Sequence, residues 1–189
     1  MKLLAFFFSR RLSLNSILLL LAAIVSFLFS SNPGTLPTRS GGTIQAQTLT
    51  GKVVRVADGD TVTIQTPGNQ ELRIRFQGID APERSQAFGR KSGAYLHSLI
   101  YGKTIRVEAE KTDQHGRTVG RVWLDDPQTG GSQDVEEAML LAGLAWHYAY
   151  FNHEKKLADA QRQAQAAKRG LWSQPDPLPP WKWRRQQKK

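Results

Sequence analysis

Three short β-type segments, at residues 49–56, 61–65 and 71–77, follow one another with only a few residues between them. The third, ELRIRFQ, alternates apolar and polar side chains, which is typical of a strand with one buried face. The connections contain Asp58-Gly59 and Pro67-Gly68-Asn69, which are typical turn sequences. Parallel neighbours would need crossover connections of about a dozen residues or more, so these segments are predicted to form an antiparallel meander.

Helical and strand patterns follow in the rest of the central part. Residues 87–100 carry apolar side chains at helical spacing, and residues 104–109 and 118–124 have the composition of strands. Two more helices are predicted at 134–143 and 153–169. Five short strands with a helix after the third predict a mainly β fold of the α+β class, a five-stranded OB-fold barrel with three helices.

Composition divides the chain into four parts. Residues 1–31 are first basic and then apolar, and residues 32–48 are rich in Ser, Thr, Gly and Pro, as flexible linkers are. Residues 49–173 hold all the predicted strands and helices and form one domain. Residues 174–189 are first Pro-rich and then basic. We expect this tail to be disordered, because chain termini without an apolar face to bury are poorly ordered.

The first part has the layout of a targeting segment. Lys2, Arg10 and Arg11 precede an apolar run at residues 12–29, as in a secretory signal. The run is about 18 residues long, which is also the lower limit for a membrane-spanning helix. We therefore expect export, either to a secreted or periplasmic location or to a membrane in which residues 12–29 remain as an anchor. The sequence leaves these two routes open.

The net charge of +10 is concentrated at the two ends of the chain. Residues 50–176 hold 17 Lys and Arg residues against 16 Asp and Glu residues, so the predicted domain is almost neutral. Affinity for nucleic acid must therefore come from a local arrangement of side chains and not from bulk charge. The chain has no cysteine, which excludes a disulfide framework, a thiolate zinc site and a cysteine nucleophile.

Acidic residues lie before the second predicted strand of the meander and after the third. Asp60 begins the second strand, and Asp80 follows the third strand. Adjacent antiparallel strands bring the start of one near the end of the next, so the two carboxylates are predicted to meet. Oxygen ligands without His or Cys favour calcium or magnesium over zinc. Asp58 is more typical of turn chemistry than of metal binding.

Three further side chains complete a set suited to phosphate chemistry. Glu83 lies three residues after Asp80, and Arg75 lies on the polar face of the third strand. Arg117 lies in a polar loop between the fourth and fifth strands, where OB folds often bind ligands. Arginines and a cation can neutralise charge that grows on a phosphate in the transition state, and a spare carboxylate can activate water.

Five motifs in order, DGDT, RIRFQGIDAPE, DQHGR, GLAWHY and AQAAKRGLW, resemble the thermonuclease family, the staphylococcal nuclease-like domain. The resemblance covers nearly all of the predicted domain. It implies an OB barrel with three helices that hydrolyses DNA and RNA with calcium and leaves 3′-phosphate ends. DNA and RNA are thus the implied partners, with Ca²⁺ as the implied cofactor.

The resemblance also assigns roles to residues of this chain. Asp60, Asp80 and the backbone carbonyl of Ala81 are implied calcium ligands, and Glu83 is the implied general base. Arg75 and Arg117 are implied to bind the phosphate and stabilise the transition state. The implied substrate-binding residues are His115, Tyr148 and Tyr150.

A second function class remains open at this stage. OB folds also serve as non-catalytic modules that bind nucleic acid or protein partners. Such a module would not need the acids and arginines that this chain retains, so the sequence favours the enzyme. In either case we expect a monomer.

Overall fold

The computed structural model of the chain describes residues 47–188. The predicted signal or anchor at 1–31 and nearly all of the predicted linker at 32–48 lie outside the described residues. None of the helices within residues 47–188 combines the length and the apolar composition needed to cross a membrane.

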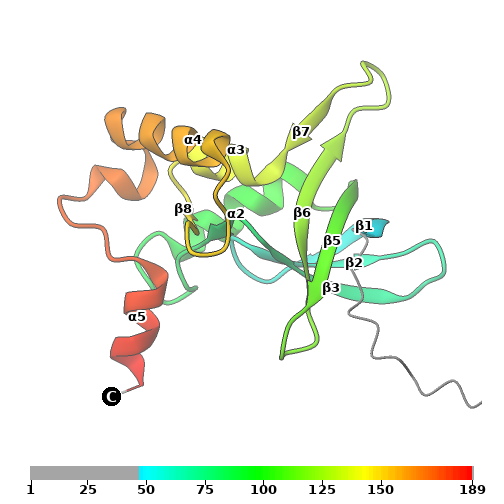
Figure 1. Cartoon of the computed structure of the whole chain (residues 1–189), viewed down its shortest axis with the longest axis horizontal. Helices are drawn as coiled ribbons and strands as arrows, with labels where there is room; N and C mark the ends of the chain where they lie inside the picture. The colour runs from blue at the N-terminus through cyan, green and yellow to red at the C-terminus, as the bar shows by residue number, and fades with distance from the viewer. Residues whose placement is uncertain (1–46, 189) are drawn as a thin grey trace, which may run out of the picture. The chain divides into compact units, whose positions relative to one another are not determined.

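Five strands form the barrel that the sequence predicts. β1 to β3 form the antiparallel meander, β1 also pairs with β5, and β5 pairs with β6. A parallel pairing between β3 and β6 closes the ring (Figure 1). The OB-fold prediction is therefore confirmed. The strands are β1 (Gln47–Val56), β2 (Thr61–Gln65), β3 (Glu71–Phe76), β5 (Thr104–Thr112) and β6 (Thr118–Asp125).

Helices and short strands complete the fold. The three predicted helices are present as α2, α3 and α4, each shorter than its predicted range, and a 3₁₀ turn follows α4. The short strands β4, β7 and β8 were not predicted, because two or three residues show no periodicity. The bounds are β4 (Ile79–Asp80), α2 (Gly89–Ile100), β7 (Ser132–Asp134), α3 (Val135–Leu141), β8 (Trp146–His147), α4 (Lys155–Ala166) and η1 (Gly170–Ser173).

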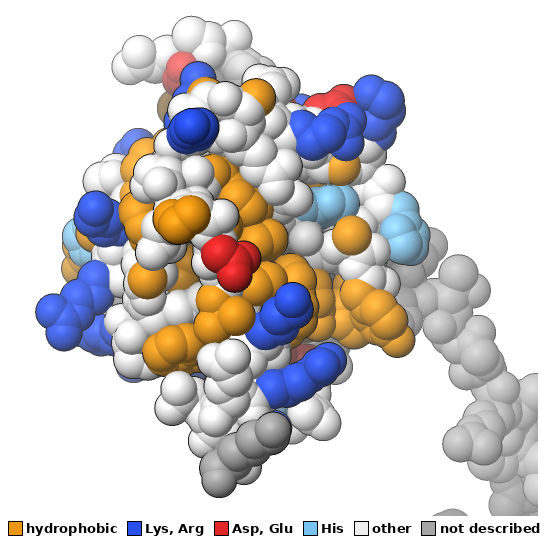
Figure 2. All heavy atoms as spheres, turned by 90° about the vertical axis from the view of Figure 1, so that its left-hand side faces the viewer, with side chains coloured by type: hydrophobic (Ala, Val, Ile, Leu, Met, Phe, Trp, Pro, Cys, Tyr) orange, Lys and Arg blue, Asp and Glu red, His pale blue; other side chains and the backbone are white. Residues whose placement is uncertain are grey.

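The C-terminal segment differs from the prediction of disorder. Residues Pro180–Gln187 form a fourth helix, α5, with Pro180 in its first turn, where a missing N–H has no cost. Trp181 packs edge-on against Trp146, with their ring centroids 5.7 Å apart. Hydrophobic side chains cover much of this side of the molecule, with basic side chains next to them (Figure 2). Aromatic packing therefore orders a segment whose composition alone indicates a solvated tail.

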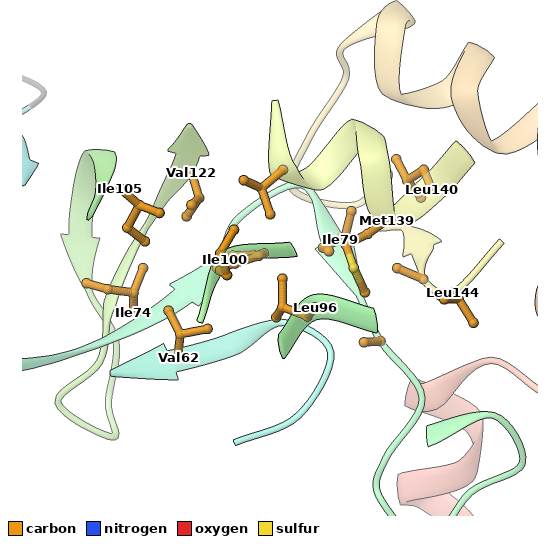
Figure 3. Packing of buried hydrophobic residues seen from close by; sticks show 14 of the residues in the cluster. Val62, Ile74, Ile79, Leu96, Ile100, Ile105, Val122, Met139, Leu140 and Leu144 are labelled. Atoms are coloured by element: carbon orange, nitrogen blue, oxygen red, sulfur yellow. The ribbon is translucent and has the colours of Figure 1, made fainter. Parts of the chain in front are cut away.

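The core lies between the barrel and the helices α2 and α3. Ile74 and Phe76 of β3 are almost fully buried, as the alternation of that strand predicts. Leu96 and Ile100 of α2 pack in the same cluster as the barrel residues, and Met139 of α3 lies at its other end (Figure 3). Burial of each such side chain contributes about 1.5–3 kcal/mol to the free energy of unfolding.

A buried carboxylate holds the segment that leads from β3 to β4. Glu136 of α3 has no exposed surface, and its two oxygens accept hydrogen bonds from the backbone N–H groups of Gln77 and Gly78 at 3.0 and 3.1 Å. Burial, with a further contribution from the nearby charge of Asp134, raises the pKa of Glu136 to about 8. Because Asp80 follows Gly78 by two residues, this contact helps to fix where Asp80 lies.

Glu136 is expected to make the stability of the fold depend on pH. Because the pKa of Glu136 is higher in the folded state, its contribution to the free energy of unfolding is fully present below its unfolded pKa of 4.5. This contribution is lost as the pH rises through about 8. Between about pH 5 and pH 8, the free energy of unfolding is expected to fall by about 3 kcal/mol from this group. Glu136→Gln cannot ionise, so it is expected to flatten this slope. Urea unfolding at several pH values measures it.

The control for this experiment is Glu137→Gln, which changes the next residue, whose side chain is partly exposed. Its unfolding free energy should keep the wild-type slope with pH. The Glu136→Gln protein is expected to start from a lower stability at pH 5, because an amide offers one acceptor to two backbone donors. Equal slopes in wild type and Glu136→Gln would show that Glu136 ionises normally in the folded state.

Candidate active site

The turn between β1 and β2 presents Asp60. The carboxylate of Asp58 accepts a hydrogen bond from the backbone N–H of Asp60 at 3.1 Å, as expected of a turn residue. A Cβ on Gly59 would lie 1.8 Å from Oγ of Ser92 and 2.7 Å from Cβ of Ala81. The turn can therefore pack this closely against α2 only with glycine at this position.

Arg75 joins the two predicted cation ligands. Its guanidinium forms an ion pair with Oδ1 of Asp60 and donates to Oδ1 of Asp80 at 2.8 Å. The register of β2 and β3 places Arg75 opposite Thr61, directly after Asp60. Asp60 is 4% exposed and Asp80 is 0% exposed. The structure thus brings two buried carboxylates to one guanidinium.

Backbone contacts hold these two carboxylates in place. The second oxygen of Asp60 accepts a hydrogen bond from the backbone N–H of Ala81 at 2.6 Å. Asp80 lies in β4, whose pairing with β8 sets Asp80 opposite Trp146. Ala81 therefore lies at the site, but its observed contact is through its N–H group. Cation binding by its carbonyl stays a prediction.

An arginine from α5 also lies at the site. Arg184 Nη1 lies 2.8 Å from Oε1 of Glu83 and 3.2 Å from Oδ1 of Asp80, and Nη2 lies 2.8 Å from Oδ2 of Asp80. Although burial alone would lower the pKa of Arg184, hydrogen bonds to Asp80 and Glu83 raise it. Arg184 is absent from the predicted site because residues 174–189 are predicted to be a disordered tail.

Arg117 and His115 lie together in the β5–β6 loop. Arg117 donates to Oδ2 of Asp113 through Nε at 2.7 Å, and its backbone N–H donates to Oδ1. Although burial opposes it, hydrogen bonds from Arg117 and from the backbone of His115 lower the pKa of Asp113. The ring of His115 lies 3.4 Å from the amide of Gln114. Within residues 47–188, no hydrogen bond or ion pair joins Arg117 or His115 to the acids around Arg75.

The predicted tyrosines line one groove. Tyr148 and Tyr150 border a groove of about 470 Å³ together with Phe151, Trp181 and Arg185. Tyr148 lies nearly parallel to Trp181, with ring centroids 6.0 Å apart, and Tyr150 is 79% exposed. The segment that carries these tyrosines directly follows β8, and β8 pairs with β4 beside Asp80. Exposed rings next to a basic side chain suit stacking against nucleobases.

The donors at Asp60 and Asp80 are compatible with a hard divalent cation. Among residues 47–188, no three or more His, Cys, Asp or Glu side chains are arranged to hold a metal ion. Asp60 and Asp80 supply two carboxylates that already converge on one cationic group. A cation held there would take its other ligands from backbone, water or substrate oxygens. Such an oxygen-only set suits calcium or magnesium.

Comparison with known proteins identifies the family. Residues 73–174 match the sequence model described as Staphylococcal nuclease homologue. A protein of Escherichia coli O157:H7 named uncharacterized endonuclease is 42% identical over 134 residues, which cover 71% of this chain and 84% of that protein. The chain belongs to the staphylococcal nuclease family.

Other members of the family carry similar names. The micrococcal nuclease of Shigella flexneri is 35% identical over 143 residues, covering 73% of this chain and 82% of that protein. A probable staphylococcal-like nuclease of Oryza sativa subsp. japonica is 37% identical over 116 residues, covering 61% of this chain and 33% of that protein. These relatives support nuclease activity, with nucleic acid as the class of substrate.

The family match does not include every residue of the site. It begins within β3, after Asp60, and ends at residue 174, before α5. Arg75, Asp80, Glu83 and Arg117 all lie within it. Arg184 lies outside it, so its presence at the site is known from the structure alone. The Pro-Pro-Trp start of α5 is the sequence signal that could have indicated a helix here.

Proposed function

We propose that this chain is a calcium-dependent nuclease that hydrolyses phosphodiester bonds of DNA and RNA with little sequence specificity. The observation that carries the proposal is the cluster of Asp60, Asp80 and Glu83 at one edge of the barrel, in which Arg75 pairs with both aspartates and Arg184 pairs with Asp80 and Glu83. Buried carboxylates converging on a shared cationic group, with a more exposed carboxylate beside them, suit hydrolysis of a phosphate ester.

The proposed reaction gives each of these residues a role. Glu83, whose side chain is 37% exposed, accepts a proton from a water molecule as its oxygen forms a bond to phosphorus. Arg75 and Arg117 bind non-bridging oxygens and stabilise the charge that grows on them. The bond from phosphorus to the 5′ oxygen breaks, and this oxygen takes a proton from solvent. The products are a 3′-phosphate end and a 5′-hydroxyl end.

Asp60 and Asp80 would hold the proposed cation. When bound, it would supply positive charge to the phosphate and lower the pKa of a coordinated water. In this structure Asp113 holds the Arg117 guanidinium through Nε and Nη2, which are groups that could otherwise form a bidentate contact with phosphate. We propose that substrate phosphate exchanges for Asp113 as the partner of Arg117.

Low sequence specificity follows from the kind of contact that the site offers. Phosphate contacts carry no direct sequence information, and aromatic rings stack on any base. Tyr148 and Tyr150 in the groove are the proposed base-stacking residues, and His115 is proposed to contact substrate from the β5–β6 loop.

The basic and apolar segment at 1–29 supports a further proposal of export, with or without retention at a membrane.

Removal of calcium is expected to abolish hydrolysis. Supercoiled plasmid and a structured RNA are incubated with the chain in Ca²⁺, and then with a chelator in excess. Both substrates should be degraded in Ca²⁺ and remain intact with chelator, because Asp60 and Asp80 then lack the cation that they are proposed to hold. Gel electrophoresis measures the loss of intact substrate.

Two further observations complete this test. Excess Ca²⁺ added after the chelator should restore degradation, which shows that the chain stayed folded. DNA fragments should become substrates for end extension at their 3′ ends only after phosphatase treatment, as expected of 3′-phosphate products. Binding of DNA with no hydrolysis in Ca²⁺ would instead identify a non-catalytic OB module.

A further inference from the structure

Arg184 is positioned to face the solvent side of the catalytic acids. Its guanidinium contacts both oxygens of Asp80 and one oxygen of Glu83. The Asp80 side chain is 1% exposed, whereas the Arg184 side chain is 41% exposed. Arg184 therefore forms an outer layer over a buried carboxylate. An anion that approaches this part of the site meets Arg184 before it meets Asp80.

The helix that carries Arg184 is anchored at its N-terminal end. Trp181 packs against Trp146 and Tyr148. Before α5, the carbonyl of Leu178 accepts a hydrogen bond from Gln86 Nε2 at 2.5 Å. These contacts link α5 to β8 and to the segment between Glu83 and α2. Arg184 is thus held at the site by packed structure, as the side chains of a preorganised site must be.

The balance of charges also points to a role for Arg184. Three carboxylates, Asp60, Asp80 and Glu83, face the guanidinium groups of Arg75 and Arg184. The second predicted phosphate-binding residue, Arg117, pairs with Asp113 in its own loop. Arg75 holds Asp80 through one charge-assisted hydrogen bond, and Arg184 holds it through two.

We propose that Arg184 is a third arginine of the active site. When the oxygens of Asp80 bind a cation, Arg184 binds the phosphate of the nucleic-acid substrate. This inference rests on the proposed nuclease function and makes α5 a part of the catalytic domain. A divalent cation at Asp80 needs oxygens that Arg184 holds, so the guanidinium must exchange one anionic partner for another. The planar guanidinium fork matches two phosphate oxygens, as it matches the two oxygens of Asp80.

An inhibitory role for Arg184 would change the rate of hydrolysis in the opposite direction. If Arg184 only blocked Asp80 and Glu83, its removal would free both carboxylates and raise the rate of hydrolysis. If Arg184 binds phosphate, its removal lowers both the rate and the affinity for substrate. Turnover and binding therefore separate a substrate-binding arginine from an inhibitory one.

Arg184→Gln in the full chain tests the inference, with Lys182→Gln as the matched control. Lys182 is exposed on the same helix, and its side chain makes none of the hydrogen bonds or ion pairs found within residues 47–188. In Ca²⁺ with single-stranded DNA, Arg184→Gln is expected to lower kcat/KM by about 100-fold, the effect of losing one donor to transition-state charge. Lys182→Gln is expected to stay near the wild-type value.

A binding measurement tests the same residue without turnover. Anisotropy of a fluorescent single-stranded oligonucleotide is followed in Ca²⁺ in a Glu83→Gln background, where hydrolysis is suppressed. Adding Arg184→Gln should weaken binding about tenfold and reduce the slope of log K against log salt by about 0.7, as loss of one phosphate contact requires. Arg184→Lys should retain most of the salt slope, because it keeps the charge, while kcat stays low.

The results distinguish failure of the inference about Arg184 from failure of the proposed nuclease function. Circular dichroism and the urea midpoint verify that each variant is folded. A folded Arg184→Gln protein with wild-type or higher kcat/KM and an unchanged salt slope would overturn the inference. Failure of wild type to hydrolyse DNA or RNA would overturn the proposed function instead, and the binding measurement would still decide whether Arg184 contacts phosphate.

Discussion

Glu83→Gln is expected to lower kcat for hydrolysis of DNA by about 10³-fold, within the usual contribution of a general base. Glutamine has nearly the same shape as glutamate but cannot accept the proton that the attacking water must lose. Glu83 is suited to this role because its backbone N–H bonds to Oε1 of Gln86 at 3.2 Å, while its side chain remains partly exposed. Initial rates of oligonucleotide cleavage at saturating Ca²⁺ measure the change.

The matched control for this prediction is Glu110→Gln. Glu110 is an exposed residue of β5 and lies outside the proposed site, so its replacement should leave kcat near the wild-type value. Glu83→Gln should keep the wild-type unfolding midpoint within a small margin, because an ion pair between partly exposed groups, such as that of Glu83 with Arg184, contributes little to stability. A folded Glu83→Gln protein that retains more than a tenth of wild-type kcat would assign the general base to another group.

The sequence was sufficient for the barrel and for the placement of Asp60 near Asp80, where both contact Arg75. Strand alternation in ELRIRFQ and the two short turns determine an antiparallel meander, because no other pairing is sterically open to such short connections. Once the meander is fixed, its geometry places Asp60 and Arg75 on adjacent strands, with Asp80 just beyond. These are local patterns with one geometric solution, so they could be predicted without the structure.

Two features of the site depend on tertiary contacts that leave little trace in the sequence. The two-residue strands β4 and β8 are too short for any periodic pattern, yet their pairing fixes the backbone of Asp80. Helix α5 is polar along most of its length, and it is ordered by packing of Trp181 against side chains distant in sequence. Arg184 was therefore missed, although the arginine next to it in space, Arg75, was predicted.

Arg75→Gln is expected to destabilise the fold by about 3–5 kcal/mol in the absence of cation, the usual cost of removing one partner of a buried ion pair. It would remove the charged partner of Asp60 and one of the two charged partners of Asp80, and both of these carboxylates are buried. Arg73→Gln is the matched control, because Arg73 is an exposed residue of the same strand. Urea unfolding in chelator measures both variants.

Addition of Ca²⁺ should restore much of this loss in Arg75→Gln. The variant leaves Asp60 and Asp80 with less competition for a cation, and a ligand that binds only the folded state stabilises it by about 2.7 kcal/mol at 100 times its Kd. The gain in unfolding free energy with Ca²⁺ should therefore be larger in Arg75→Gln than in wild type or Arg73→Gln. Equal gains in all three proteins would mean that Asp60 and Asp80 do not form one cation site. This measurement tests the cation site through folding alone, so its outcome does not depend on whether Glu83, Arg117 or Arg184 acts in catalysis.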